Sequence, residues 1–474
     1  MNLLQRIPRF HVLVFLVFLI LFLGNQGPLY DQDEAAYAGF ARTMIESGDF
    51  ILQSFPFSEP HRKPPLHIWL TAFSFSTFGI SEFSMRLFPL LWIFLTCILT
   101  YMISTLLFDK RVGKFSFIIL ATSLYFPLNG KIALVDGLLT FLETLGFYAL
   151  VHLLKRPSSN VVSYVLLFWF SIALGALTKG PPIFIFLGGI CFVFLWFQET
   201  RKVIFQLKPW FFLPVALLPL LYWGYLAWER TNGEMIRWMY EWYVLRRATD
   251  PVFGQSGPPG SYTILFFVTL FPWSIFLPFV TKDIWSKLKV WKSEKDYDFL
   301  VLISALLFGW IFYEFMQSKL PSYPLASYPI LSILIANEAI KAKRLTFTKW
   351  LVIFAFLQVI LINLFLTPYL NEKRSDTKRI AQLWKSKITQ DSKIIALKNY
   401  AIPSLAFYLE RKIDVKKDML EWKSIPAGSL VLVDKESYLL FSAIGMKSKV
   451  YLEEEEIWLY DRNKSIRLLI VSIL

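Results

Sequence analysis

Long apolar runs separated by more polar segments dominate the chain between residues 10 and 367. The runs cover 10–24, 84–107, 115–128, 137–154, 161–177, 181–198, 210–228, 261–280, 299–316, 321–338 and 350–367. A transmembrane helix needs about 20 predominantly apolar residues, and most runs reach or approach that length. The pattern predicts a polytopic α-helical membrane protein with about eleven transmembrane helices.

The pattern changes after residue 367, where short apolar stretches alternate with charged ones. "KIIALK" (393–398) and "SLVLVDK" (429–435) are typical of buried strands. "DTKRIAQLWKSKI" (376–388) has its apolar residues at helical spacing, with Ser375 or Asp376 as its predicted N-terminal cap.

We therefore predict two domains. Residues 1–367 form the transmembrane domain, with a first outer loop at 25–83, and residues 368–474 form a small soluble α/β domain. The acidic run "EEEE" (453–456) is predicted to be a solvated loop.

Composition supports a membrane protein and argues against a disulfide-rich protein and a nucleic-acid-binding protein. Hydrophobic residues make up 55% of the chain and charged residues only 18%, whereas soluble domains average about 25% charged. Cys97 and Cys191 both lie inside apolar runs, which excludes a disulfide framework. The net charge of +14 agrees with basic cytoplasmic loops, so no nucleic-acid partner is predicted.

The distribution of Lys and Arg predicts the orientation. With the N-terminus in the cytoplasm, the cytoplasmic segments carry 19 basic residues and the opposite, longer loops carry 10, as the positive-inside rule requires. Eleven spans then place the C-terminal domain on the outer side. The first run follows Arg6 and Arg9 without a small-residue cleavage site, so we expect a retained span.

In this orientation the ionisable residues of interest collect on the outer side. They are Asp31, Asp33, Glu34, Arg42, Arg62, Lys63, Lys131, Asp136, Lys179, Arg246 and Lys319, with Tyr323 nearby. Lys and Arg side chains hold phosphate groups. A carboxylate in a partly desolvated pocket accepts a proton from an attacking hydroxyl. The set therefore suits an anionic, lipid-linked substrate.

Each of these residues taken alone also has a structural explanation. Asp33 and Glu34 suit the first turn of a helix, where carboxylates are favourable. Lys179 and Lys319 stand at span ends, where long basic side chains reach for the interface.

Four motifs in order link the first outer loop to a known family. They are "DEAAYA" (33–38), "SGDF" (47–50), "KPPLHIW" (63–69) and "GISEFSMRL" (79–87), and later matches are "ALVDGLLTFLETLGFY" (133–148), "GALTKGPP" (175–182), "LFPW" (270–273) and "SKLPSYPLASYP" (318–329). This series resembles the ArnT-like and protein-mannosyltransferase-like membrane glycosyltransferases of the GT-C type. The resemblance covers about residues 10–338 and leaves the C-terminal segment out.

The resemblance implies an inverting glycosyltransferase that moves a sugar from a polyprenyl-phosphate donor to an acceptor. It implies that Asp33 is the catalytic base, with Glu34 its neighbour and Asp136 a second acid. Lys63 then binds the donor phosphate, with Lys179, Lys319 and Tyr323 as further contacts. Arg62, Tyr37 and Arg246 complete the substrate-binding candidates.

The chain departs from the ArnT pattern at three positions. Ala36 stands where Arg is frequent, Arg62 where Glu often precedes Lys-Pro-Pro, and Gln255 lies in a loop that often carries His. A metal held by that Glu and His is not supported by the sequence, and we expect no cofactor to be required. The sugar stays open, as does the acceptor, which is a glycolipid such as lipid A, a glycan or a protein.

Two other functions remain open at this point: a transporter or flippase for a polyprenyl-phosphate sugar, and a non-catalytic assembly subunit. Transporters place ionisable groups near the bilayer midplane, whereas these lie at span ends. The retained Asp33 and Glu34 favour an enzyme over a subunit without activity. The expected location is the outer face of the bacterial inner membrane.

Overall fold

The computed structural model describes residues 10–31, 33–60, 63–246, 256–342, 345–389, 392–416, 418–459 and 463–474. The chain divides into two compact units. The first comprises Met1–Leu23, Lys63–His67 and Arg86–Asn363, and the second comprises Gly24–Arg62, Ile68–Met85 and Leu364–Leu474. The C-terminal segment thus shares a unit with most of the first outer loop, a grouping that the division at residue 367 does not anticipate.

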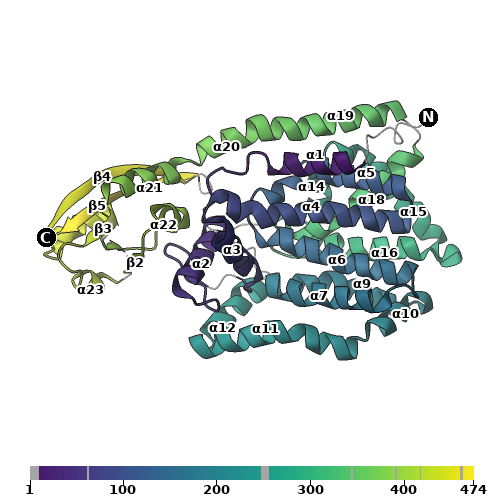
Figure 1. Cartoon of the computed structure of the whole chain (residues 1–474), viewed down its shortest axis with the longest axis horizontal. Helices are drawn as coiled ribbons and strands as arrows, with labels where there is room; N and C mark the ends of the chain where they lie inside the picture. Colours follow the sequence, from purple (N-terminus) through teal and green to yellow (C-terminus); the bar gives the residue numbers. More distant parts are fainter. Residues whose placement is uncertain are drawn as a thin grey trace. The chain divides into compact units, whose positions relative to one another are not determined.

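Each apolar run of the sequence contains helix. The helices are α1 (Phe10–Phe22), α4 (Glu82–Leu107), α5 (Lys110–Thr122), α6 (Val135–Lys155), α7 (Val161–Lys179), α8 (Pro181–Ile183), α9 (Gly189–Phe194), α11 (Pro209–Thr231), α14 (Ser261–Thr269), α15 (Leu277–Glu294), α16 (Tyr297–Leu306), α17 (Phe312–Glu314), α18 (Ser327–Lys341) and α19 (Leu345–Leu361). Helix α7 packs against both α6 and α11 (Figure 1).

Within the described residues, six helices are long and apolar enough to cross a membrane. They lie at Glu82–Leu107, Val135–Lys155, Val161–Lys179, Pro209–Thr231, Tyr297–Glu314 and Phe347–Lys373. The span Pro209–Thr231 leaves large apolar side chains exposed, among them Trp210, Phe211, Leu218 and Leu221. Water penalises such a surface and lipid does not. The predicted count of eleven spans stays a prediction.

Several predicted runs are interrupted rather than continuous. A π-helical turn at Phe184–Gly188 separates α8 from α9, and others lie at Leu307–Ile311 and Ile362–Leu366. In the run 261–280 the α-helix α14 ends before Pro272. A short 3-10 turn at Trp273–Phe276 follows and leads into α15. Proline lacks the N–H that a helix requires, so a break at this position follows from the sequence.

Among the described residues before residue 300, four α-helices lie outside the predicted spans. They are α2 (Glu34–Ser47), α3 (Leu66–Phe78), α10 (Gln198–Leu207) and α12 (Glu234–Tyr240). Helix α2 begins directly after Asp33, which agrees with the helix start expected for this acidic segment.

The C-terminal segment contains a five-stranded sheet of order β2-β1-β3-β5-β4. Its strands are β1 (Ile394–Ala396), β2 (Ile413–Val415), β3 (Leu430–Asp434), β4 (Ser448–Leu459) and β5 (Lys464–Ile473). Strands β2 and β3 run parallel to β1, while β5 is antiparallel to β3 and β4. Both strands predicted here are present and buried. Their side chains, among them Val431 and Val433 of β3, pack in one hydrophobic core with Val471 of β5.

Helices α20 (Thr367–Lys373), α21 (Asp376–Lys387), α22 (Pro403–Leu409), α23 (Met419–Trp422) and α24 (Lys435–Ala443) complete this segment. Helix α21 confirms the predicted helix, and Ser375 is its N-cap residue as predicted, although its side chain makes no capping hydrogen bond. The Ser375 hydroxyl donates to the Glu372 carbonyl, and Asp376 accepts the Trp458 N–H of β4 at 3.3 Å. The outer location of this segment stays a prediction.

The acidic run 453–456 is not a loop, as the sequence suggested, but part of strand β4. Strand β4 is an edge strand that pairs only with β5 in the sheet. Charged side chains on an edge strand face water and discourage pairing with another chain, so four glutamates are compatible with a strand here.

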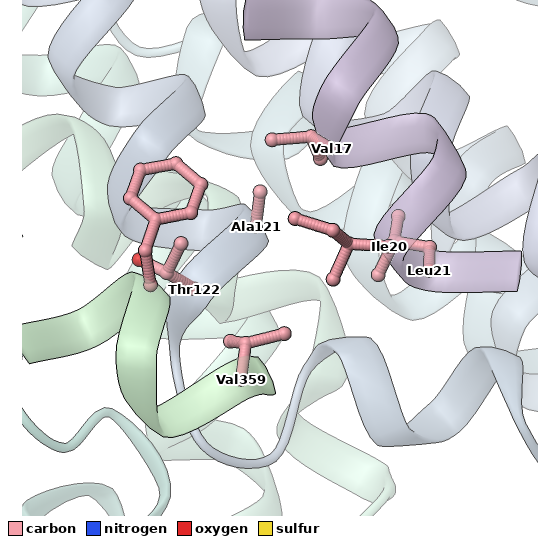
Figure 2. Close-up of a pocket in the computed structure, with 7 residues that line it drawn as sticks. Val17, Ile20, Leu21, Ala121, Thr122 and Val359 are labelled. Atoms are coloured by element: carbon pink, nitrogen blue, oxygen red, sulfur yellow. The ribbon is translucent and has the colours of Figure 1, made fainter. Parts of the chain in front are cut away.

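A small cavity lies where α1, α5 and α19 meet (Figure 2). Its volume is about 10 Å³, and its walls are Val17, Ile20, Leu21, Ala121, Thr122, Phe356 and Val359. That space suffices for about one water molecule, so it has no room for a sugar or a phosphate.

Candidate functional site

An ion pair joins the ends of two neighbouring helices in the first unit. Asp136 lies in the first turn of α6, and Lys179 is the last residue of α7. The connection between these helices is short, so the start of α6 and the end of α7 come together. Lys179 Nζ donates to Asp136 Oδ1 at 2.6 Å, and the two side chains are only 14% and 12% exposed.

The local sequence favours both ends of this pair. A carboxylate at a helix N-terminus and a cation at a C-terminus both interact favourably with the helix dipole. Gly180 follows Lys179 with φ of 77°, a conformation that glycine adopts without strain. The chain therefore leaves α7 directly after placing the ammonium group.

Three further residues surround the pair. Lys179 Nζ lies 5.3 Å from the ring centroid of Tyr323. The Ser322 hydroxyl hydrogen-bonds the Asp136 carboxylate, and Lys63 is close enough to act on it electrostatically. The fold thus brings together four predicted site residues that are far apart in the sequence. Two ammonium groups beside an aromatic hydroxyl are suited to binding a phosphate.

Glu143 is a buried acid that the sequence interpretation missed. It lies seven residues after Asp136 on α6, which places it about two turns further along the same face. Its side chain is almost fully buried, and it interacts electrostatically with Lys179. The signal that could have found it is an isolated acid inside the apolar run 137–154, because ionisable residues in such runs are costly.

Lys319 lies in a second ionic cluster of the same unit. Its Nζ donates to the Glu314 carbonyl at 2.7 Å and to the Tyr313 carbonyl at 3.3 Å. It also lies 3.9 Å from Glu314 Oε2, with its side chain 5% exposed. These contacts tie Lys319 to the polypeptide. A contact between Lys319 and the donor phosphate is a prediction from the sequence only.

Glu314 in turn holds the start of helix α14. Its carboxylate accepts the N–H groups of Gly260 at 2.9 Å and Thr263 at 3.1 Å, and the Trp310 indole N–H at 3.1 Å. Free N–H groups at a helix start need such partners. Glu314 was also missed, although it too is an isolated acid within an apolar run, 299–316.

We expect Glu314→Ala to lower the thermal stability of the protein substantially. Each buried donor left unpaired costs about 1–3 kcal/mol, and Lys319 also loses its counter-ion. The melting temperature in detergent measures the effect. Glu199→Ala is the matched control, because its pair with Lys202 is exposed and exposed pairs contribute about 0–1 kcal/mol. Equal melting temperatures for both variants would contradict this role of Glu314.

Lys131 binds backbone carbonyls of another segment and is not assigned to the cluster around Asp136. Its ammonium donates to the carbonyls of Leu21 and Leu23, near the end of α1. Burial, together with the nearby Arg86, lowers the pKa of Lys131 to about 8.

The carboxylates of the DEAAYA motif lie in the second unit and differ in exposure. Asp33 precedes the first turn of α2 and is exposed, in contrast to the partly desolvated environment expected of a base. Glu34 is completely buried, and its Oε2 accepts the Tyr30 N–H at 2.9 Å. Tyr37, one turn further along α2, is buried as well. Of the two adjacent acids, Asp33 is the exposed one.

The structure says less about the remaining candidate residues. The Arg246 guanidinium lies 4.3 Å from the Trp242 ring centroid and 3.2 Å from Glu241 Oε1, so these contacts are local. Arg62 and Gln255 lie outside the described residues. Among the residues that the structure describes, no three His, Cys, Asp or Glu side chains are grouped as metal ligands.

Comparisons with known proteins find similarity to glycosyltransferases. Residues 62–228, which include Lys63, Asp136 and Lys179, match the family profile described as dolichyl-phosphate-mannose-protein mannosyltransferase. The undecaprenyl phosphate-alpha-4-amino-4-deoxy-L-arabinose arabinosyl transferase of Enterobacter sp. (strain 638) is 24% identical over 359 residues, which are 72% of this chain and 62% of that protein. The chain is thus similar to the ArnT-like membrane glycosyltransferases of the GT-C type.

The solved structures show the GT-C fold over nearly the whole chain. ArnT from Cupriavidus metallidurans, solved bound to undecaprenyl phosphate, has a TM-score of 0.74 and 17% identity, with 97% of both chains covered. The oligosaccharyltransferase AglB from Archaeoglobus fulgidus has a TM-score of 0.54 and 12% identity, covering 86% of this chain and 64% of AglB. This ArnT-like chain is therefore a multi-pass membrane protein. It spans about three fifths of the length of the curated arabinosyl transferases that it matches.

Proposed function

We propose that this chain is an inverting glycosyltransferase that transfers a sugar from a polyprenyl-phosphate donor to an acceptor at the outer face of the bacterial inner membrane. The observation that carries the proposal is the grouping of Lys63, Asp136, Lys179 and Tyr323 in a chain of this family. In this proposal the N-terminus is cytoplasmic and residues 368–474 are periplasmic.

The buried Asp136–Lys179 pair prepares the site for an anionic leaving group. Asp136 orients the Lys179 ammonium before the donor arrives, and the two lysines then interact with the donor phosphate. Fixed charges aimed at the position where charge develops stabilise a transition state more than solvent does. Lys63 and Lys179 therefore lower the cost of releasing polyprenyl phosphate.

The reaction is a single displacement. The Asp33 carboxylate accepts the proton of the acceptor hydroxyl, whose oxygen forms a bond to the anomeric carbon of the sugar. The bond between that carbon and the phosphate oxygen breaks, and its electron pair leaves with polyprenyl phosphate. Attack opposite the leaving group inverts the configuration. General base catalysis of this kind contributes about 10² to 10⁴ in rate.

The relatives support the class of donor. The arabinosyl transferases carry undecaprenyl phosphate in their names, and the ArnT structure contains it. We propose an undecaprenyl-phosphate-type sugar as donor and a glycolipid such as lipid A, a glycan or a protein as acceptor. Ala36, in place of a frequent Arg near the base, is a reason not to assign the sugar of those relatives to this chain.

A transfer assay tests the proposal. Purified protein in detergent receives a panel of radiolabelled polyprenyl-phosphate sugars, together with membrane lipid and protein extracts as acceptors. Label that moves to an acceptor supports the proposal and names the donor and acceptor classes. Donor binding without transfer from any donor would overturn it in favour of a flippase or a binding subunit.

Removal of divalent cations is expected to leave the transfer rate unchanged. The reason is that Lys63 and Lys179 supply the positive charge at the leaving phosphate, and Arg62 occupies the position where relatives often have Glu. Rates are measured before and after dialysis against EDTA. A loss that added Mg²⁺, Mn²⁺ or Zn²⁺ restores would show that the enzyme requires a metal.

A further inference from the structure

The second unit ties the C-terminal segment to the start of the acidic motif. Helix α22 packs against α2, the helix that begins directly after Asp33 (Figure 1). The Ser404 N–H, in the first turn of α22, donates to Asp31 Oδ1 at 3.0 Å. The Leu29 N–H donates to the Tyr408 hydroxyl of the same helix at 2.9 Å. Two residues shortly before Asp33 are therefore anchored by α22.

The Tyr408 hydroxyl connects this anchor to a second part of the first loop. It donates to Glu82 Oε1 at 3.2 Å, and Lys378 forms an ion pair with the same carboxylate. Tyr408 itself is 9% exposed. A buried hydroxyl that both accepts and donates a hydrogen bond holds its two partners at a defined separation.

Contacts on both sides of Tyr408 widen the interface. The Arg42 guanidinium donates to the Phe407 carbonyl at 3.2 Å. The rings of Phe75 and Phe407 lie 6.3 Å apart, and the Arg374 guanidinium stacks 3.7 Å from the Tyr30 ring centroid. Helix α22 and its neighbours thus contact the loop before Asp33, along α2 and at α3.

The segment between these anchors is short and internally bonded. The Asp33 N–H donates to the Asp31 carbonyl at 3.0 Å, and the Ala35 N–H donates to the Tyr30 carbonyl at 2.9 Å. A displacement of residues 29–31 is therefore transmitted directly to Asp33.

We propose that α22 is a positioning element for the Asp33 carboxylate, with the Tyr408 hydroxyl and the Asp31–Ser404 hydrogen bond as its two anchors. The proposal rests on the proposed function, in which Asp33 is the base. It gives the C-terminal segment a part in turnover, and it makes Asp31 a helix-capping residue.

The expected effect follows from the precision that acid–base chemistry requires. Catalytic groups need to be held within about 0.5 Å of their productive position. A misplacement of about 1 Å costs up to about 10²-fold in rate. Loss of an anchor is therefore expected to lower kcat, while the lysines that bind the donor, and hence the KM for the donor, are unaffected.

Tyr408→Phe tests the first anchor, because it removes the hydroxyl and keeps the ring. We expect kcat to fall about 10-fold or more with the donor KM unchanged. We also expect faster amide hydrogen exchange at residues 29–40. Tyr451→Phe is the matched control: its hydroxyl donates to the Lys387 carbonyl elsewhere in the same unit. Equal melting temperatures for the two variants exclude general unfolding as the cause.

Asp31→Asn and Asp31→Ala test the second anchor. Asn keeps an oxygen that accepts the Ser404 N–H, so we expect nearly wild-type kcat, whereas Ala is expected to behave like Tyr408→Phe. If Asp31→Asn abolishes turnover, Asp31 acts chemically and the positioning role is overturned.

Failure of the proposed function and failure of the positioning role give different experimental results. If wild-type protein transfers no sugar, the proposed function fails, and hydrogen exchange still shows whether α22 holds residues 29–40. If wild-type protein is active but Tyr408→Phe matches Tyr451→Phe in both kcat and exchange, the positioning role is wrong.

Discussion

Replacement of Asp33 by Asn is expected to lower turnover about 10² to 10⁴-fold and to leave donor binding largely intact. Asn is close in shape and suits the position before α2, but it cannot accept a proton from the acceptor hydroxyl. The measurement is the transfer rate at saturating donor, alongside equilibrium binding of the labelled donor.

Asp31→Asn is the matched control for this prediction, since it makes the same chemical change two residues away and keeps the hydrogen bond to Ser404. Full activity of Asp33→Asn would refute the assignment of the base. Asp136 is then the next candidate, because its carboxylate lies beside the lysines that are proposed to hold the donor.

Separating the Asp136–Lys179 pair is expected to produce the second large effect. Lys179→Met leaves Asp136 buried without its partner, and breaking a buried pair costs about 3–5 kcal/mol of stability. The same variant is expected to weaken donor binding about 10- to 100-fold, because hydrogen bonds to charged groups contribute about 1.5–3 kcal/mol.

The double variant Asp136→Leu/Lys179→Met distinguishes structure from function. Two apolar residues remove the unpaired charge, so we expect the melting temperature to recover while donor binding stays weak. Lys155→Met with Asp298→Leu is the control, because this 2.7 Å pair is about 30% exposed on both sides. Recovery of donor binding in the Asp136–Lys179 double variant would show that Lys179 has only a structural role.

The membrane helices were predictable because lipid imposes one simple requirement. A segment that crosses a bilayer must be apolar over about 20 residues and must satisfy its own backbone hydrogen bonds. Each predicted run therefore contains helix, and the breaks come at local features such as Pro272. The strands β1 and β3 were also predictable, because both are short apolar runs between charged residues.

The acidic strand β4 was not predictable from local sequence. Four consecutive glutamates have low strand propensity, and their residence in a strand depends on pairing with β5. This pairing is a contact between separate segments, so a local interpretation favours a loop. In the same way, the Asp376 side chain accepts the Trp458 N–H of β4, a partner that the local sequence does not indicate.

The sequence by itself determined the class of the protein, its resemblance to a family and the residue types of its candidate site. Hydrophobic length and ordered motifs such as DEAAYA and KPPLHIW are local properties, and they are readable without a fold. The placement of Asp136 and Lys179 at the same end of two neighbouring helices also follows from the sequence, because the connection between α6 and α7 is short.

Only the tertiary structure decided the partner of each charge. Asp31, Asp33 and Glu34 are three carboxylates within four residues, and no local rule separates them. The fold makes Asp31 a cap for α22 and buries Glu34 against the Tyr30 N–H, while it leaves Asp33 exposed. The physical reason is that the environment of a side chain depends on residues hundreds of positions away, here Ser404 and Tyr408.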